Sequence, residues 1–217
     1  MHSCERMHSI RPLTHCHLYG ILDTGYCQAE KMPAMLEELI AGGIHIIQLR
    51  AKGYPEDRAE ELARALLPAT MAAGIPLVVN DWPGVAGRIG AQGTHVGQDD
   101  MPLNEARREA GPRVFVGKST HSVAQAVAAS NEGADCIGFG PLFATLTKPE
   151  YQPIGTEEIR HVHELISIPV FCIGGIKREH ITPLRAAGAR RVVIVSGILT
   201  APSPRAYTAE CLGLLES

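Results

Sequence analysis

The sequence of 217 residues has few aromatic residues, little net charge and no long apolar segment. Aromatic residues make up 5% of the chain and the formal net charge is -3, so no general attraction to nucleic acid exists. No apolar run approaches the roughly 20 residues that span a bilayer, and the N-terminus lacks the apolar core of a signal peptide. These absences predict a cytoplasmic protein that binds neither nucleic acid nor membrane.

The six cysteines are scattered along the chain and show no paired spacing. Two of them lie in apolar, strand-like runs, where a reduced thiol behaves as a small hydrophobe, so no disulfide framework is expected. Near the N-terminus, Cys4, His15, Cys16 and His17 could be interpreted as a zinc site. The lack of a Cys-x-x-Cys pair favours an irregular N-terminal extension instead.

Short apolar runs alternate with longer amphipathic segments along the whole chain. The expected strands are residues 17–22, 43–49, 76–79, 93–96, 114–117, 136–139, 170–173 and 192–195. The expected helices are residues 32–41, 56–73, 83–89, 103–110, 122–131, 156–165 and 178–187. Ala-Gly pairs end four of these helices, at residues 41–42, 73–74, 110–111 and 187–188, where a left-handed glycine is expected.

Eight such units without a Pro/Ser/Gly-rich linker predict one α/β domain, a (β/α)8 barrel at residues 17–217. Residues 1–16 form a short N-terminal extension in this interpretation. The chemistry of such barrels lies at the C-terminal ends of the strands. The residues that follow each expected strand are therefore the candidates for function.

The second strand ends in a polar motif, Q-L-R-A-K at residues 48–52. Because side chains alternate along a strand, Gln48, Arg50 and Lys52 should project to the same side. Arginine can bind a phosphate with two hydrogen bonds and lysine adds a point charge, although surface decoration of a loop is the alternative.

Carboxylates follow the third and fourth strands, at Asn80-Asp81 and at residues 97–100. If Asp81 and an aspartate of the second group converge, they offer oxygen ligands to Mg²⁺, which is held by one or two carboxylates and by substrate phosphates. Aspartate is also favoured as a helix cap, and the two roles do not exclude each other.

The sixth strand leads into G-F-G-P-L-F-A-T-L-T-K at residues 138–148. Glycines allow close approach of a ligand, hydroxyls donate hydrogen bonds and Lys148 supplies a cation, a combination that suits a phosphate. A glycine-rich turn with a surface lysine is the alternative. The loops after the seventh and eighth strands, residues 173–176 and 195–197, occupy the position where barrels often bind a second phosphate.

The ordered set of motifs resembles the thiamine phosphate synthase family from about Leu18 to the last helix. The motifs are Q-L-R-x-K at residues 48–52, N-D at 80–81, H-V-G-Q-D-D at 95–100, G-x-S-T-H-S at 117–122, G-x-G-P-x-F-x-T-x-T-K at 138–148, I-G-G-I at 173–176 and V-S at 195–196. The resemblance implies a transferase that condenses 4-amino-2-methyl-5-hydroxymethylpyrimidine diphosphate with 4-methyl-5-(2-phosphoethyl)thiazole. Thiamine phosphate and pyrophosphate are the products that it implies, with Mg²⁺ as cofactor.

The resemblance also implies roles for individual residues. The diphosphate would be bound by Arg50, Lys52, Asn80 and Lys148, and Mg²⁺ by Asp81 and Asp100. The remaining contacts would come from Gln48 and Ser119 to the pyrimidine, from Thr145 and Thr147 to phosphate oxygens or the thiazole, and from Gly175, Val195 and Ser196 to the thiazole phosphate. His95 resembles a pocket residue of the family, and a structural hydrogen-bonding role is its alternative.

Two positions depart from the family pattern, and several other functions stay open. Ala51 stands where an acidic residue is frequent, and Ala144 where a proline is expected. The alternatives are a thiazole tautomerase-like paralogue, another phosphosugar isomerase or lyase, and a non-catalytic sensor of phosphate ligands. The partners expected are small-molecule substrates, and a homo-oligomer is left open.

Overall fold

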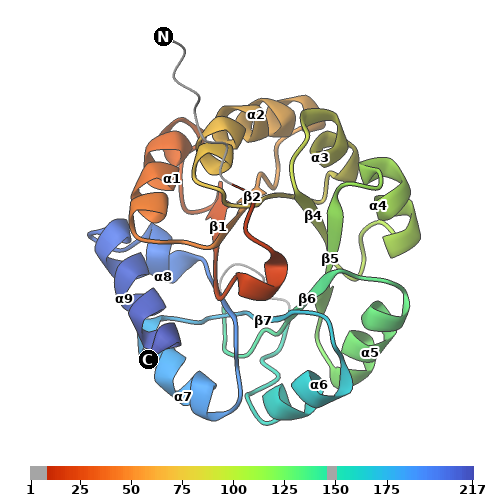
Figure 1. Ribbon diagram of the computed structural model, residues 1–217, viewed down its shortest axis with the longest axis vertical. Coiled ribbons are helices and arrows are strands. Elements are labelled where there is room, and N and C mark those ends of the chain that lie inside the picture. Colours follow the sequence, from red (N-terminus) through yellow and green to blue (C-terminus); the bar gives the residue numbers. More distant parts are fainter. Residues whose placement is uncertain (1–8, 146–150) are drawn as a thin grey trace.

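The computed structural model describes residues 9–145 and 151–217. Eight parallel strands form a closed barrel in chain order, as Figure 1 shows with the helices arranged in a ring outside them. The strands are β1 Leu18–Asp23, β2 Ile46–Arg50, β3 Leu77–Asn80, β4 Gly93–Val96, β5 Phe115–Thr120, β6 Cys136–Phe139, β7 Val170–Cys172 and β8 Val192–Ile194. The predicted (β/α)8 fold class is confirmed.

The helices alternate with the strands and pack against their outer faces (Figure 1). They are α1 Met32–Ala41, α2 Glu56–Ala72, α3 Pro83–Ile89, α4 Leu103–Ala110, α5 Val123–Asn131, α6 Ile159–Leu165, α7 Ile181–Ala186, α8 Ser196–Leu199 and α9 Pro204–Glu216, with 3-10 turns η1 Leu13–His15, η2 Ala29–Lys31 and η3 Arg178–His180. In the part of the chain that the structure describes, no helix is long and apolar enough to cross a membrane.

Several predicted boundaries differ from the observed ones. The first two strands reach Asp23 and Arg50, one residue beyond their predicted ends, because these two residues are paired in the β1–β2 register. The predicted helix 178–187 begins with η3, and residues 156–158 form a turn before α6. Ser122, the first residue of the helix predicted at 122–131, instead caps α5, since its hydroxyl accepts a hydrogen bond from Gln125 N at 3.2 Å.

The prediction of a left-handed Gly42 is wrong. Gly42 has a φ of -82°, and its neighbour Gly43 has the positive φ, 86°. A Cβ on Gly42 would lie 2.7 Å from the carbonyl oxygen of Arg205, so this glycine is needed for the close approach of α9. Gly74, Gly111 and Gly188 have positive φ as predicted.

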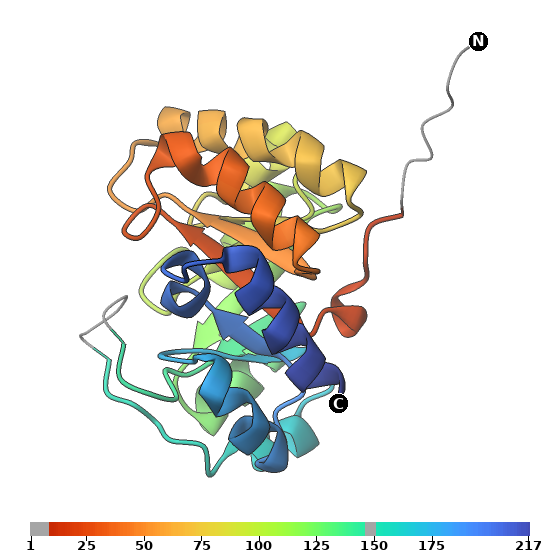
Figure 2. The same ribbon diagram turned by 90° about the vertical axis from the view of Figure 1, so that its left-hand side faces the viewer.

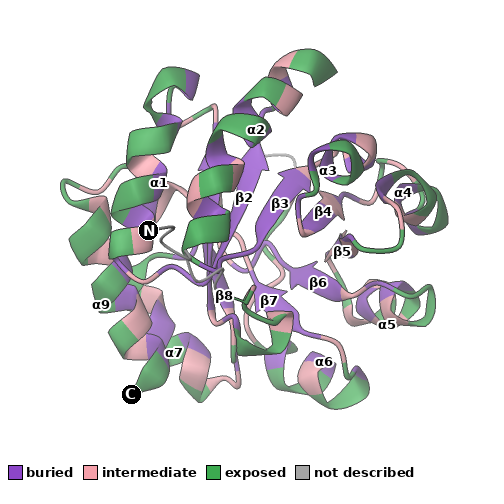
Figure 3. Cartoon of the chain, turned by 45° about the horizontal axis from the view of Figure 1, so that its top comes forward, coloured by how far each residue is buried: buried purple, intermediate pink, exposed green. Residues whose placement is uncertain are grey.

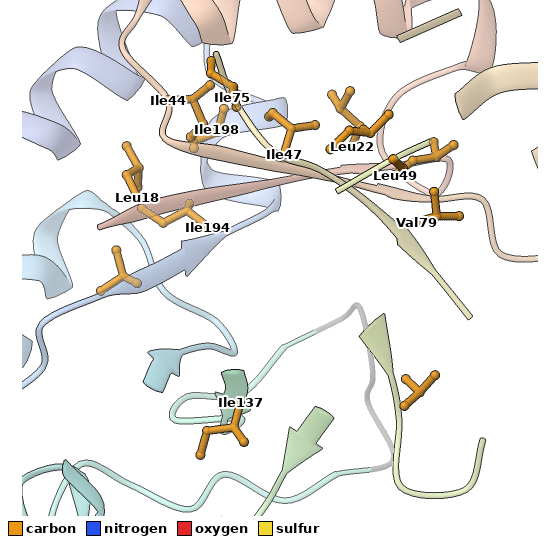
Figure 4. Packing of buried hydrophobic residues seen from close by; sticks show 14 of the residues in the cluster. Leu18, Leu22, Ile44, Ile47, Leu49, Ile75, Val79, Ile137, Ile194 and Ile198 are labelled. Atoms are coloured by element: carbon orange, nitrogen blue, oxygen red, sulfur yellow. The ribbon is translucent and has the colours of Figure 1, made fainter. Parts of the chain in front are cut away.

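The buried apolar residues form two layers. The larger layer lies between the strands and the helices and includes Leu18, Leu22, Ile47, Leu49 and Val79, which are labelled in Figure 4. Figure 3 shows the resulting pattern, with buried strands inside a ring of helices that are exposed on their outer faces. Continuous apolar strands are required because a parallel barrel is covered on both sides.

A smaller layer fills the inside of the barrel. It consists of Cys16, Tyr19, Ile21, Ile46, Val78, Cys136, Phe171 and Val193. Apart from Cys16, which precedes β1, these residues are the inward-facing partners of the outward-facing residues in the larger layer, as alternation along a strand requires. The interior is therefore a packed core, and polar chemistry is confined to its rim.

The segment before β1 closes the N-terminal end of the barrel. Leu13 packs against the interior cluster, and the Cys16 thiol lies 3.4 Å from the carbonyl oxygen of His45, just before β2. Figure 2 shows this segment running along one end of the barrel before it enters β1. Burial raises the pKa of Cys16 to about 11, so the thiol stays protonated and does not favour a zinc thiolate. The domain boundary near residue 17 stays a prediction.

The contact between α3 and α4 gives a test of the packing. A Cβ on Gly87 would lie 2.6 Å from the carbonyl oxygen of Ala110, a backbone atom that cannot move aside alone. We expect Gly87→Ala to lower the free energy of unfolding by about 1–3 kcal/mol, measured by denaturant titration. Gly213→Ala is the matched control, because nothing lies within 4 Å of that position in α9. Equal denaturation midpoints for the two variants would contradict the close contact between Gly87 and Ala110.

Candidate active site

A cavity opens among the C-terminal ends of the strands and collects most of the predicted site residues. Those that line it are Gln48, Arg50, Asn80, His95, Ser119, Thr145, Gly175, Val195 and Ser196. They come from seven of the eight strands or the loops that follow them, and the apolar interior cluster forms the floor with Tyr19, Cys136 and Phe171. The cavity is thus polar at its rim and apolar below.

Strand alternation explains how β1 and β2 supply the first wall. Tyr19, Ile21 and Asp23 face the cavity from β1, and Gln48 and Arg50 face it from β2. In the register of the two strands, Ile21 is paired with Gln48 and Asp23 with Arg50. The side chains of the two strands therefore meet as neighbours across the wall.

Gln48 is held by Tyr19. Nε2 of Gln48 donates a hydrogen bond to the Tyr19 hydroxyl at 2.7 Å, and the two residues are 3% and 4% exposed. The Phe171 ring meets the Tyr19 ring edge-on, with 5.3 Å between centroids. Burial raises the pKa of Tyr19 well above its usual range, so the phenol stays neutral. This bond fixes the Gln48 amide and leaves its Oε1 to accept from a ligand.

Arg50 is held by Asp23. Nη1 of Arg50 donates to Oδ2 of Asp23 at 2.7 Å, and both residues are buried. Asp23 is not among the predicted site residues, because the first strand was expected to end at Leu22. The alternation of Tyr19, Ile21 and Asp23 is the signal that could have found it.

His95 and Ser119 form the third polar contact. Nε2 of His95 lies 3.0 Å from the Ser119 hydroxyl, and the two residues are half-buried on β4 and β5. A Cβ on Gly117 would lie 2.5 Å from Nδ1 of His95, so the imidazole occupies space that only a glycine leaves open. His95 therefore lines the cavity and is also a structural hydrogen-bonding residue.

His121 and Tyr151 also line the cavity and were missed as site residues. Their rings stack with 4.2 Å between centroids and 24° between planes. Nδ1 of His121 is 2.5 Å from the carbonyl oxygen of Gly140, and the Tyr151 hydroxyl donates to Asp99 at 3.2 Å. His121 stood in a quoted motif, but nothing in the spacing placed Tyr151 beside it.

The loops after β7 and β8 form the opposite wall. Gly174 and Gly175 have φ of 97° and 65°, and a Cβ on Gly175 would lie 2.5 Å from the carbonyl oxygen of Ala144. Phe143 N donates to the carbonyl of Gly174 at 3.0 Å, which fastens the loop after β6 to this wall. Glycine is required at position 175 for both its dihedral angle and its space.

Of the predicted site residues that the structure describes, three do not line the cavity, namely Lys52, Asp81 and Asp100. Lys52 is exposed in the turn after β2, so strand alternation does not extend to it. Thr147 and Lys148 lie outside the described residues.

The two carboxylates are suitable ligands for a magnesium ion shared with a substrate. Asp81 follows β3 in the left-handed region, with a φ of 62°, and Asp100 lies after β4, where its Oδ2 accepts from Gly97 N at 2.7 Å. Among residues 9–145 and 151–217, no three His, Cys, Asp or Glu side chains form a metal-binding group. Two hard oxygen donors fit Mg²⁺ when phosphate oxygens and water complete its shell.

The thiols of the cavity region are poor nucleophiles. Burial raises the pKa of Cys136, in the cavity floor, to about 12, and that of Cys172, in β7, also to about 12. A thiolate is the reactive form, and these groups remain protonated near neutrality. The arrangement therefore suits binding and charge stabilisation rather than covalent catalysis.

The comparisons with known proteins agree on one family. Residues 18–198 match the family model described as thiamine monophosphate synthase. The thiamine-phosphate synthase of Shouchella clausii is 39% identical over 200 residues, covering 92% of this chain and 96% of the relative. That of Herpetosiphon aurantiacus is 41% identical over 188 residues, covering 86% and 90%.

Solved structures agree with the sequence relatives. Thiamine phosphate pyrophosphorylase from Pyrococcus furiosus superposes with a TM-score of 0.83 at 30% identity, covering 92% of this chain and 95% of that one. A 3-hexulose-6-phosphate synthase has a TM-score of 0.71 at 16% identity, covering 92% and 99%, which shows a shared fold alone.

The Tyr19–Gln48 bond can be tested through stability. Tyr19→Phe would leave the buried Nε2 of Gln48 without its partner, so we expect the free energy of unfolding to fall by about 1–3 kcal/mol. Denaturant titration measures the change. Tyr54→Phe is the control, because Tyr54 is 37% exposed. If both variants unfold like the parent protein, the bond does not hold Gln48.

Proposed function

This chain belongs to the thiamine monophosphate synthase family, and we propose that it joins the pyrimidine diphosphate to the thiazole phosphate. The reaction forms thiamine phosphate and releases pyrophosphate. The observation that carries the proposal is one cavity whose two walls suit two anions. One wall carries Gln48, Arg50 and Asn80, and the other carries Gly175 and Ser196.

The first wall is the place for the diphosphate. Arg50 would bind its oxygens, Asn80 would donate through its amide, and Lys52 would add charge from the rim. Lys148 is assigned the same role from the sequence resemblance. Gln48 and Ser119 also line the cavity, where they would orient the pyrimidine ring above the apolar floor.

Asp81 and Asp100 would hold Mg²⁺ at the ends of β3 and β4. The bound ion supplies positive charge to the leaving pyrophosphate. Arg50 would work in the same direction from its fixed position on β2, because charge develops on the bridging oxygen as the bond breaks.

The second wall is the place for the thiazole phosphate. Gly175 would offer its backbone N–H, Ser196 its hydroxyl, and Val195 apolar contact at the start of α8. Thr145 lines the cavity from the loop after β6, between the two walls, and Thr147 is assigned a neighbouring role from the sequence. Holding both substrates in register removes most of the entropy barrier of a two-substrate reaction.

The bond changes require no protein nucleophile. The carbon–oxygen bond of the pyrimidine diphosphate breaks, its electron pair leaves with pyrophosphate, and the pyrimidine stabilises the cation that remains. The thiazole nitrogen then donates its lone pair to the same carbon and forms the new carbon–nitrogen bond. The protonated thiols of Cys136 and Cys172 are in keeping with this course.

The alternatives have less support. A thiazole tautomerase-like paralogue would not need the diphosphate and metal residues, which this chain retains at Arg50, Asn80, Asp81 and Asp100. The relatives described above carry the synthase name. A non-catalytic sensor would bind the same ligands without turnover. The proposal includes small-molecule substrates and a cytoplasmic location, as expected from the sequence. It leaves a homo-oligomer open.

Turnover separates these functions. With Mg²⁺ and both substrates, we expect the purified protein to form thiamine phosphate and pyrophosphate in equal amounts, measured by chromatography and a coupled pyrophosphate assay. The expected basis is charge stabilisation on the leaving group. Binding of both substrates without product would favour the sensor and contradict the proposal.

The metal assignment predicts a change in magnesium dependence. We expect Asp100→Ala to raise the Mg²⁺ concentration for half-maximal activity by about 10-fold or more, because one of two hard ligands is lost. Asp99→Ala is the matched control, since that carboxylate accepts from Tyr151. A magnesium titration of Asp100→Ala that overlays the control would remove Asp100 from the metal shell.

A further inference from the structure

The carboxylate of Asp23 lies inside a cavity that is proposed to bind anions. Its Oδ2 accepts from Nη1 of Arg50 at 2.7 Å, and the two side chains are 3% and 11% exposed. Both residues line the cavity. A negative charge beside the arginine that receives a diphosphate opposes binding, so its presence requires an explanation.

The Asp23 carboxylate is fixed in place. Its Oδ1 accepts from Gly25 N at 2.8 Å, and its backbone carbonyl accepts from Tyr26 N and Cys27 N at 2.9 Å each. Thr24 N donates to the carbonyl of Arg50 at 3.1 Å, which fastens the same turn to β2. Because one carboxylate oxygen holds the turn, the other is presented to Arg50.

Arg50 needs a counter-ion when no anion is bound. A buried guanidinium without a partner is strongly destabilising, and the ion pair with Asp23 removes that penalty. The pair uses one of the five N–H donors of Arg50. The remaining donors keep a fixed direction, since the planar group is held at one corner.

On the basis of the proposed function, we infer that Asp23 is a positioning residue that acts through Arg50 as its resident counter-ion. It orients the guanidinium toward the diphosphate and lowers the affinity of the pocket for free pyrophosphate. When the substrate binds, Arg50 shares its charge between the carboxylate and the phosphate oxygens. When pyrophosphate leaves, Asp23 alone compensates Arg50 again.

A purely structural role for Asp23 makes a different prediction. If the carboxylate only holds the turn at residues 23–27, its loss lowers stability and weakens or leaves unchanged the binding of anions. A counter-ion role predicts that its loss lowers stability but strengthens anion binding, because pyrophosphate then replaces the missing partner of a buried arginine. The sign of the change in affinity separates the two roles.

The experiment is a calorimetric titration of inorganic pyrophosphate, with Mg²⁺ present, into the full chain and its Asp23→Asn variant. Asparagine keeps an oxygen for Gly25 N and removes the charge. We expect Asp23→Asn to bind pyrophosphate about 5- to 10-fold more tightly, a change near the factor of ten that corresponds to about 1.4 kcal/mol. Unchanged or weaker binding by the folded variant would overturn the inference.

A second background tests whether Asp23 acts through Arg50. In Arg50→Gln, we expect the further change Asp23→Asn to alter pyrophosphate affinity by less than about 2-fold, since the coupling between the two residues is gone. If the same tightening persists, Asp23 repels the anion directly and the inference is wrong.

Two controls keep the test decisive. Asp23→Glu retains the charge and is expected to bind pyrophosphate within about 2-fold of the parent protein, so tightening by this variant would overturn the inference even if Asp23→Asn does not fold. Asp135→Asn removes a carboxylate that forms an ion pair with Arg107, with 2.7 Å between Oδ2 and Nη2. Neither residue lines the cavity. This variant should leave pyrophosphate affinity unchanged.

Pyrophosphate binding does not depend on turnover. If the parent protein makes no thiamine phosphate, the proposed function fails while the titrations still decide the role of Asp23. If it turns over and Asp23→Asn does not tighten, the role of Asp23 fails alone.

Discussion

Every strand of this barrel is hydrogen-bonded along both edges, and the closed ladder forces alternate side chains inward at every strand. Near the N-terminal end these inward positions are apolar and form the packed core around Tyr19, Cys136 and Phe171. Two or four residues further along the strands, the inward positions become Asp23, Gln48, Arg50, Asn80 and Ser119. The site is the continuation of the core by polar residues, so its geometry is as fixed as the barrel.

Two pairs on neighbouring strands show how this rigidity reaches the chemistry. Tyr19 fixes the amide of Gln48, and Asp23 fixes the guanidinium of Arg50, both at 2.7 Å. These groups need no reorganisation when charge develops on a leaving group, which is the condition under which electrostatic stabilisation is effective. The ion pair adds a restraint on product affinity, because the same arginine must both receive and release an anion.

Much of the site could be predicted because its residues lie in or directly after strands. Gln48, Arg50, Asn80 and Ser119 were placed by counting strands and applying the barrel rule. Asp23 was missed because the strand register, and not local composition, decides that β1 continues past Leu22. Lys52 was expected to share the face of Arg50, but the strand ends first and local alternation stops there. Tyr151 meets His121 only through the path of the folded chain, which no spacing encodes.

The claim that one cavity holds two anionic groups on opposite walls is tested most directly by a crystal structure with Mg²⁺, pyrophosphate and thiamine phosphate. Pyrophosphate should contact Arg50 and Asn80, the pyrimidine should lie against Gln48, and the phosphate of the product should lie at Gly175 and Ser196. Either product bound outside this cavity, or both phosphate groups on the same wall, would contradict the two-substrate site.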